Sequence, residues 1–193
     1  MVIIIAGYFF FIQNVFEIED VEYNDINVST FSYIHFTKLY PFFIGTLFSL
    51  GIPILYSKEM GRFRKKEADR IFGFGVLMTI TVGIIMFIAI SFLGDIFLQS
   101  SSPHKEVLAY AKEYLFWMRL TFLVMPFQML LSEIVNGDGD EFISTIANVI
   151  QGLGNITLSI VLSRFIGMRG IGFASFIFYI ISLLILLIHF GRK

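Results

Sequence analysis

Apolar residues in this chain gather in long runs that short polar segments separate. A helix needs roughly 20 apolar residues to cross a bilayer core about 30 Å thick. Runs that meet this requirement cover approximately residues 31–56, 71–98, 114–135, 142–165 and 171–190. A further run, residues 2–16, is apolar but short, and we interpret it as an abbreviated first span. The pattern predicts an all-α integral membrane protein, a bundle of about six transmembrane helices in one domain over residues 1–193.

The same runs could instead form the core of a soluble helical protein. Such a core needs amphipathic helices to cover it, and the sequence shows none outside one short basic loop. Hydrophobic residues make up 56% of the 193 residues, and the mean hydropathy is +0.81. This balance exceeds that of an ordinary soluble domain, so the membrane interpretation is favoured.

Charged residues between the runs predict the orientation, because cytoplasmic loops carry an excess of Lys and Arg. The loop 58–70 holds six basic residues against three acidic ones, and we expect it to be cytoplasmic. Residues 17–25 hold five acids and no base, which suits the outer side. Alternating crossings then place both termini in the cytoplasm and put Arg164 and Arg169 outside, a mild departure from the rule. We expect a multi-pass protein of the plasma membrane.

Turn signals mark several boundaries between the runs. Ser102-Pro103 is typical of a helix start, with a capping serine and a proline at the first helical position. Asn136-Gly137-Asp138-Gly139 predicts a turn. We expect the glycines at positions 167, 170 and 172 to break the chain between the last two spans. Connections this short make successive helices antiparallel neighbours.

Polar side chains recur along one side of the run at 142–165. Spacings of four, three, four and four residues place them in one sector of a helix; they are Ser144, Asn148, Gln151, Asn155 and Ser159. One interpretation is adhesion, because small and polar residues commonly hold membrane helices together. The other is a cavity-facing stripe that contacts an ion or a substrate, which would explain why it holds more amides than packing requires. In both cases we expect the stripe to face the interior of the bundle.

Ionisable residues within the runs are functional candidates, because charge inside a bilayer is costly. They are Lys38, Asp95, Arg119 and Glu133. Lys38 can extend its ammonium to the interface, and Asp95 lies near the outer end of its run. Arg119 and Glu133 each lie within two turns of the end of a run, which favours anchoring at the interface. Glu133 remains the best candidate in this chain for a proton-carrying acid.

Pro126 and Gln128 lie near the middle of the run at 114–135. A proline inside a helix leaves a backbone carbonyl unpaired and can kink the helix. Pro126 is therefore a hinge candidate, and Gln128 is a candidate for a substrate or cation site.

The sequence shows no enzyme motif. With no cysteine, the chain has no disulfide, no thiolate metal ligand and no cysteine nucleophile. Three scattered histidines do not predict a metal site, and no glycine-rich phosphate loop is present. We expect no enzymatic activity, no metal, no cofactor and no nucleic-acid partner.

Three stretches of the chain resemble the multidrug and toxic compound extrusion (MATE) family. The first is Ser57-Lys58-Glu59-Met60-Gly61 followed by Lys66-Glu67-Ala68-Asp69-Arg70, which is similar to the family's cytoplasmic segment after the second helix. The second combines Tyr114-Leu115 and Pro126 with Asn136-Gly137-Asp138-Gly139, where Asn136 replaces the family's arginine. The third joins Gly154-Asn155-Ile156-Thr157-Leu158 to Gly170-Ile171-Gly172-Phe173-Ala174. Their order and spacing over residues 35–190 are more specific than any of them alone.

The resemblance implies a transporter of twelve helices in two six-helix lobes, of which this chain would be the first. Such proteins export drug-like cations in exchange for protons or sodium. The resemblance also places a cation-site residue at Asn155. The aspartate that bacterial members often carry one turn later is Ser159 here, and residues 2–16 hold no acid. The cation site expected in this lobe therefore looks incomplete.

We therefore expect secondary active efflux of organic cations by antiport with protons or sodium, through alternating access. The expected partners are the lipid bilayer, the organic cation and a second six-helix lobe. A flippase for lipid-linked saccharides is the alternative within transport, although it would be expected to carry several cavity-facing Arg and Lys. The alternative of another class is a half-transporter remnant or assembly element that does not transport.

Overall fold

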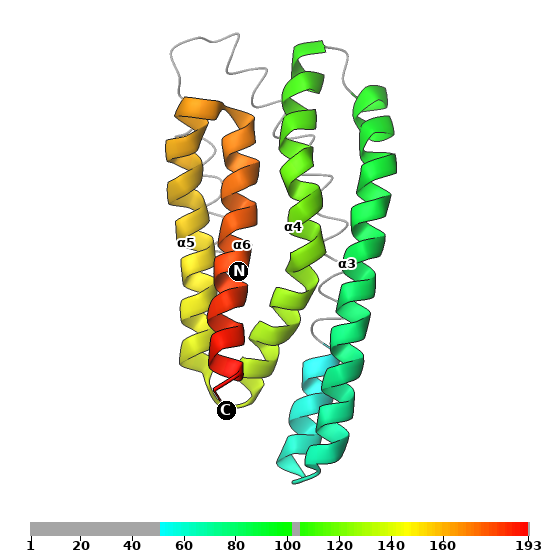
Figure 1. Ribbon diagram of the computed structural model, residues 1–193, viewed down its shortest axis with the longest axis vertical. Coiled ribbons are helices and arrows are strands. Elements are labelled where there is room, and N and C mark those ends of the chain that lie inside the picture. The colour runs from blue at the N-terminus through cyan, green and yellow to red at the C-terminus, as the bar shows by residue number, and fades with distance from the viewer. Residues whose placement is uncertain (1–50, 102–104, 193) are drawn as a thin grey trace.

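The computed structural model describes residues 51–101 and 105–192 of the chain. Residues 51–61 are helical, and four long helices follow. These are α3 (Lys65–Ser101), α4 (Lys105–Gly137), α5 (Glu141–Ile166) and α6 (Met168–Phe190) (Figure 1). The helical fold class is confirmed. The predicted span 2–16, most of the span 31–56, Lys38 and Ser102-Pro103 lie outside the described residues.

Each of the four long helices is long and apolar enough to cross a membrane. The candidate spans are Lys65–Gly94, Ala109–Gly137, Glu141–Ile166 and Met168–Phe190. They contain most or all of each apolar run predicted at 71–98, 114–135, 142–165 and 171–190. All four begin earlier than their run, because helical hydrogen bonding continues into the polar flanks. The predicted basic loop 58–70 is therefore shorter than expected, since its second half forms the first turn and a half of α3.

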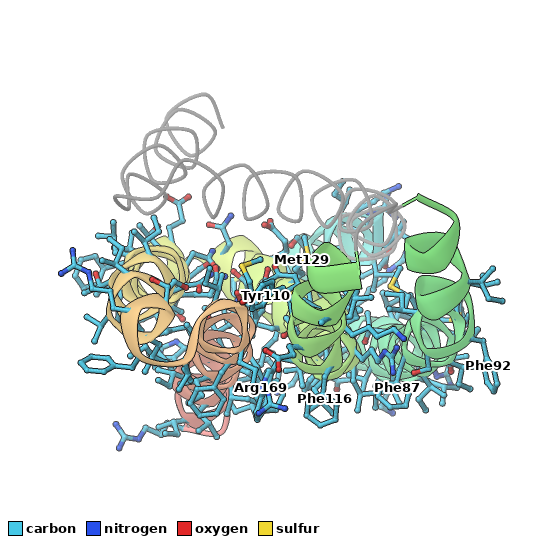
Figure 2. The ribbon with its side chains drawn as sticks, turned by 90° about the horizontal axis from the view of Figure 1, so that it is seen from above. Phe87, Phe92, Tyr110, Phe116, Met129 and Arg169 are labelled. Atoms are coloured by element: carbon cyan, nitrogen blue, oxygen red, sulfur yellow. The ribbon has the colours of Figure 1, made fainter. Side chains whose placement is uncertain are left out.

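The four helices lie in a row in the order α3, α4, α6, α5 (Figures 1 and 2). Helix α6 packs against both α4 and α5, and α4 also packs against α3. In Figure 1, α4 runs beside α3 in its upper part and leans toward α5 and α6 in its lower part. The expectation that successive helices are neighbours holds for α3 and α4 and for α5 and α6. Helices α4 and α5 contact each other mainly near their turn, because α6 lies between them along most of their length (Figure 1).

Apolar side chains fill the contacts within this row. The largest cluster joins α3, α4 and α6, with Tyr114 and Leu115 of α4 buried in it. A second cluster joins residues 51–61 to α3 and α4, and a third joins the ends of α4 and α6 to the start of α5. Figure 2 shows Phe87, Phe92 and Phe116 along one edge of the row. Phe92 and Phe116 are exposed there, as expected of side chains that face lipid.

The glycines between α5 and α6 do not all break the chain, which corrects the expectation from the sequence. Only Gly167, with a φ of 58°, lies between the two helices, whereas Gly170 and Gly172 are inside α6. A Cβ on Gly170 would lie 2.6 Å from the Leu162 side chain, and one on Gly172 would lie 2.9 Å from the Trp117 side chain. These two glycines therefore allow close helix packing, as small residues do in membranes.

The turn between α4 and α5 has the hydrogen bonds of a Schellman motif. The Asp140 N–H donates to the Val135 carbonyl at 3.2 Å, and the Gly139 N–H donates to the Asn136 carbonyl at 3.2 Å. Gly139 has a φ of 90°, the left-handed conformation that this motif requires after a helix. The turn predicted at 136–139 is therefore present, with its first two residues still in the last turn of α4.

Candidate functional site

The predicted polar stripe on α5 divides into two separate clusters of hydrogen bonds. We name the first the turn-proximal cluster, because it lies near the turn between α4 and α5. It consists of Gln128, Ser132, Ser144, Asn148 and Ser182. We name the second the turn-distal cluster, and it consists of Asn155, Ser159 and Ser175. Both clusters join α5 to neighbouring helices.

Gln128 of α4 is the centre of the turn-proximal cluster and is only 2% exposed. Its Nε2 donates to Ser182 Oγ of α6 at 2.9 Å and to Asn148 Oδ1 of α5 at 3.2 Å. An amide nitrogen carries two protons, so these two bonds use its full donor capacity. A single α4 side chain thereby connects both neighbouring helices.

Ser132, one turn after Gln128 on α4, extends the cluster toward the turn. Its hydroxyl accepts a bond from Asn148 Nδ2 at 2.9 Å and lies 2.9 Å from Ser144 Oγ. The Ser144 hydroxyl donates to the Ser132 carbonyl at 3.0 Å. The Ser132 hydroxyl is therefore the donor of the bond between the two serines. Ser132 and Ser144 are buried, whereas Asn148 is hydrogen-bonded but keeps part of its side chain exposed.

The turn-distal cluster is centred on one oxygen atom. Asn155 Oδ1 accepts a bond from Ser159 Oγ at 3.1 Å and one from Ser175 Oγ of α6 at 3.3 Å. The Ser175 hydroxyl also lies 3.1 Å from the Ile171 carbonyl of its own helix. Ser159 and Ser175 are buried, and Asn155 is half-buried. Three uncharged oxygen-bearing side chains therefore meet between α5 and α6.

The structure does not bring the other predicted site residues into these clusters. Gln151 lies between them on α5 and is half-buried, and no described residue forms a hydrogen bond with its amide. Glu133 is half-buried next to Ser132, but it makes no hydrogen bond to the described cluster residues. Helix α4 continues through Pro126, which is buried, so the hinge stays a prediction.

Arg119 does not lie near a helix end, which corrects the expectation of interfacial anchoring. Helix α4 begins at Lys105, well before the apolar run, so Arg119 lies close to the middle of the helix. Another basic residue, Arg169, does lie near a helix start, and its Nε is 3.6 Å from Glu113 Oε1 of α4. This carboxylate helps to explain why an arginine is tolerated on the side expected to be outer. The side chain of Asp95 lies outside the described residues.

Sequence reasoning missed Ser132, Ser175 and Ser182, although their spacing carried a signal. Ser132 follows Gln128 by one turn of α4, and Ser175 and Ser182 are seven residues apart on α6. Residues at these spacings share a helix face. Polar positions on three helices therefore match one another, whereas only the stripe on α5 was predicted from the sequence.

Both clusters are electrically neutral, and this limits their chemistry. Their hydroxyl and amide groups can donate and accept hydrogen bonds, and their oxygens can coordinate a hard cation. They cannot carry a proton as a change of charge. Among the described residues, no group of three or more His, Asp or Glu is placed to hold a metal ion.

Comparison with known families identifies the chain. The model of the MatE family matches residues 22–161, which is more than half of the sequence. The match includes α3, α4 and the α5 residues of both polar clusters. No curated protein and no solved structure gives a significant match. The chain therefore belongs to the MatE family of membrane transporters.

Proposed function

We propose that this protein takes part in secondary active efflux of organic cations, coupled to a proton or sodium gradient, through alternating access of two lobes. The turn-distal cluster is the observation that carries the proposal. Asn155, where the family resemblance places a cation-site residue, directs its Oδ1 at two hydroxyl groups in the contact between α5 and α6. A small cation bound here would take the place of the two hydroxyl protons that now bond to Asn155 Oδ1.

The composition of this cluster favours sodium over protons as its ligand. A serine hydroxyl can rotate and present a lone pair to a cation, so Asn155, Ser159 and Ser175 can supply three neutral oxygens. Hard cations prefer oxygen ligands. Proton coupling would need a group that changes its charge, and Glu133 is the candidate that we retain on α4. It lies outside both clusters, which is why we favour sodium at this site.

The turn-proximal cluster has a different part in the proposal. Gln128 and Ser132 already use their polar groups on α5 and α6 partners, so this cluster fixes the three helices relative to one another. Neither cluster contains a basic side chain that could bind a pyrophosphate. This composition supports efflux of cations over the alternative of a lipid-linked saccharide flippase.

Transport in proteoliposomes tests the proposal. We would measure movement of the organic cation ethidium, driven by a sodium gradient or by a pH gradient, in the protein assembled with its second lobe. Asn155→Ala should remove the sodium dependence, because it deletes the oxygen that both serines address. Thr157→Val is the matched control, since Thr157 is exposed on the same helix and its hydroxyl donates to the Leu153 carbonyl of that helix. If Asn155→Ala keeps normal transport and ion dependence, the cluster only holds helices together and the proposal is wrong.

A further inference from the structure

The connection between residues 51–61 and α3 carries a feature that transport does not explain. In Figure 1 the end of this hairpin extends beyond the lower ends of α4, α5 and α6. Phe63 lies in the connection, and its side chain is 97% exposed. We name residues 58–66 the basic tip, because lysine and arginine make up more than half of the stretch.

Phe63 is held in a backbone conformation that suits glycine. Its φ is 58°, and it is the only described residue other than glycine with a positive φ. The Phe63 N–H donates to the Met60 carbonyl at 2.9 Å, and the Arg64 N–H donates to the Glu59 carbonyl at 3.0 Å. These are the two bonds of a Schellman motif, in which Phe63 has the position that Gly139 has in the turn between α4 and α5.

Phenylalanine at this position is unfavourable in two independent ways. A side chain in the left-handed region strains the backbone, and an exposed aromatic ring orders water. Glycine would avoid both costs, as it does at position 139. Local strain of this kind is typical of sites that contact another molecule, so we infer that the ring has a partner other than the described residues.

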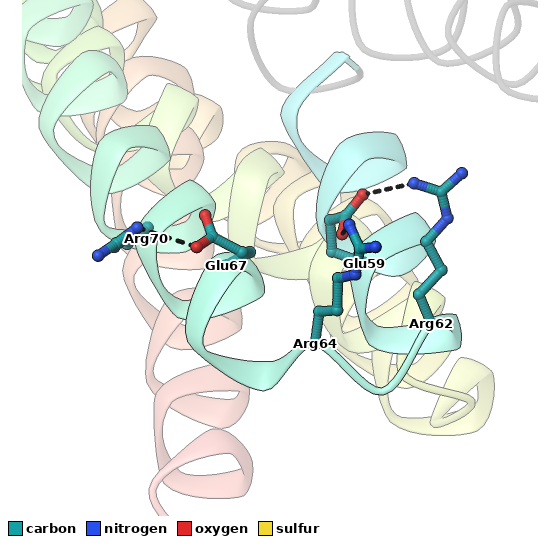
Figure 3. A network of polar contacts seen from close by, with 5 residues as sticks. All are labelled: Glu59, Arg62, Arg64, Glu67 and Arg70. Atoms are coloured by element: carbon teal, nitrogen blue, oxygen red, sulfur yellow. Dashed lines mark hydrogen bonds and ion pairs between the residues drawn. The ribbon is translucent and has the colours of Figure 1, made fainter.

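Arginines of the hairpin form ion pairs with Glu59 and Glu67 (Figure 3). Glu59 pairs with Arg62 at 3.1 Å and lies 3.7 Å from Arg64, and Glu67 pairs with Arg70 at 2.9 Å. The lysines Lys58, Lys65 and Lys66 are exposed and form no ion pair with any described residue. The basic tip therefore presents three ammonium groups around one exposed ring.

We propose that the basic tip binds anionic phospholipid headgroups of the leaflet beside it, with the Phe63 ring inserted between them. The apolar part of α3 starts at Ile71, so Lys65 lies about 9 Å farther along the helix. The polar zone of a bilayer extends about 5–8 Å beyond the hydrocarbon on each side. The tip is therefore at the outer limit of the headgroups, within reach of lysine side chains and a phenyl ring. Basic clusters next to a membrane helix bind anionic lipid in this way.

A single tryptophan placed at the tip can test this contact. The chain has one tryptophan, so Phe63→Trp combined with Trp117→Phe leaves one indole, at the position of interest. The protein is reconstituted in vesicles of phosphatidylcholine alone or mixed with phosphatidylglycerol, with a nitroxide spin label on a fraction of the phosphatidylcholine headgroups as a quencher. We expect blue-shifted emission and strong quenching only in the anionic vesicles. Because the attraction is electrostatic, added salt should weaken both signals.

Two sets of variants make the result specific. In the first set, Lys58, Lys65 and Lys66 are changed to Gln in the protein that already carries Phe63→Trp and Trp117→Phe. Each lysine removed should lower the ratio of lipid-bound to unbound tip about fivefold. Asn136→Trp with Trp117→Phe is the matched control, because Asn136 is exposed beside the other Schellman turn, among acidic residues. Its emission should be the same in both lipids.

The proposal is wrong if the indole at the tip stays in water in both lipids, as expected for a tip that binds an acidic protein. Equal quenching in neutral and anionic vesicles would also overturn it. A second measurement does not depend on the tryptophan variant. Phosphatidylglycerol should raise the melting temperature of the wild-type chain more than that of Phe63→Gly, and equal shifts would count against lipid binding.

Discussion

Helices α3 and α4 contact each other through close packing, whereas α4, α5 and α6 are also joined by hydrogen bonds between side chains. On α3, the hydroxyls of Thr79, Thr81 and Ser91 donate to carbonyls of their own helix. Helix α3 instead approaches α4 through Gly83, where a Cβ would lie 2.7 Å from the Leu123 carbonyl oxygen. Across α4, α5 and α6, side chains of different helices bond directly to one another.

This difference determines how easily the helices of each contact can slide along one another inside a membrane. Lipid is as apolar as leucine, so helices in lipid associate through close packing and polar bonds. A contact held by shape can slide without leaving a polar group unpaired. A contact held by hydrogen bonds cannot, because unpaired polar groups are costly away from water. We interpret α4, α5 and α6 as one rigid unit, and the contact of α3 with α4 as the place where the lobe can yield.

The largest effect is expected for Gly83→Val, which would break the close approach of α3 and α4. The new side chain meets backbone atoms of Leu123, which cannot move aside, and the lobe should lose about 3 kcal/mol of unfolding free energy. Unfolding by SDS titration in mixed micelles measures this loss. Gly73→Val is the matched control, since a Cβ on Gly73 would meet nothing within 4 Å. Similar losses for both variants would contradict the role of the close approach.

A smaller loss, about 1 kcal/mol, is expected for Gln128→Leu. This change replaces the amide by an apolar side chain of similar size and leaves Asn148 Oδ1 and Ser182 Oγ without their shared donor. Thr81→Val serves as the control on α3, because Thr81 is exposed and, among the described residues, its hydroxyl bonds to a carbonyl of its own helix. The same SDS titration should show little change for it. A loss at Thr81 as large as that at Gln128 would remove the distinction between the two contacts.

Ser159→Asp should change ion coupling more than stability. The aspartate adds next to Asn155 a group that changes charge on binding a proton, so ethidium transport should become more dependent on a pH gradient than in the wild type. Ser159→Asn is the control, because it has nearly the same size and no titratable group. If the two variants respond equally to the pH gradient, a titratable group at this position does not determine coupling.

The smallest effect is expected at the ion pair between Glu113 and Arg169. Both side chains are more than a third exposed, so Glu113→Gln should cost less than about 0.5 kcal/mol. High salt should hide even that difference in the unfolding measurement. A larger cost would mean that the contact of α4 with α6 depends on its rim as well as on Gln128.

The helical fold could be predicted largely from the sequence, because the length of an apolar run relates directly to bilayer thickness. The stripe on α5 was also visible, since a helix converts spacing into a common face. Its partners could not be found in this way. Ser182 meets Gln128 only because α6 lies between α4 and α5, and the order of helices depends on how their surfaces fit. Gly170 and Gly172 were misread for the same reason, because their role comes from Leu162 and Trp117.

The central place of α6 also determines how the lobe can be assembled. The bonds between α4 and α5 in the turn-proximal cluster can form as soon as these two helices are inserted. Asn155 and Gln128, however, receive their partners Ser175 and Ser182 only when the next helix arrives. Until then Asn148 is already bonded to α4, whereas Asn155 has only Ser159 of its own helix as a partner. The order of synthesis therefore leaves Asn155 and Gln128 without part of their hydrogen bonding until α6 is inserted.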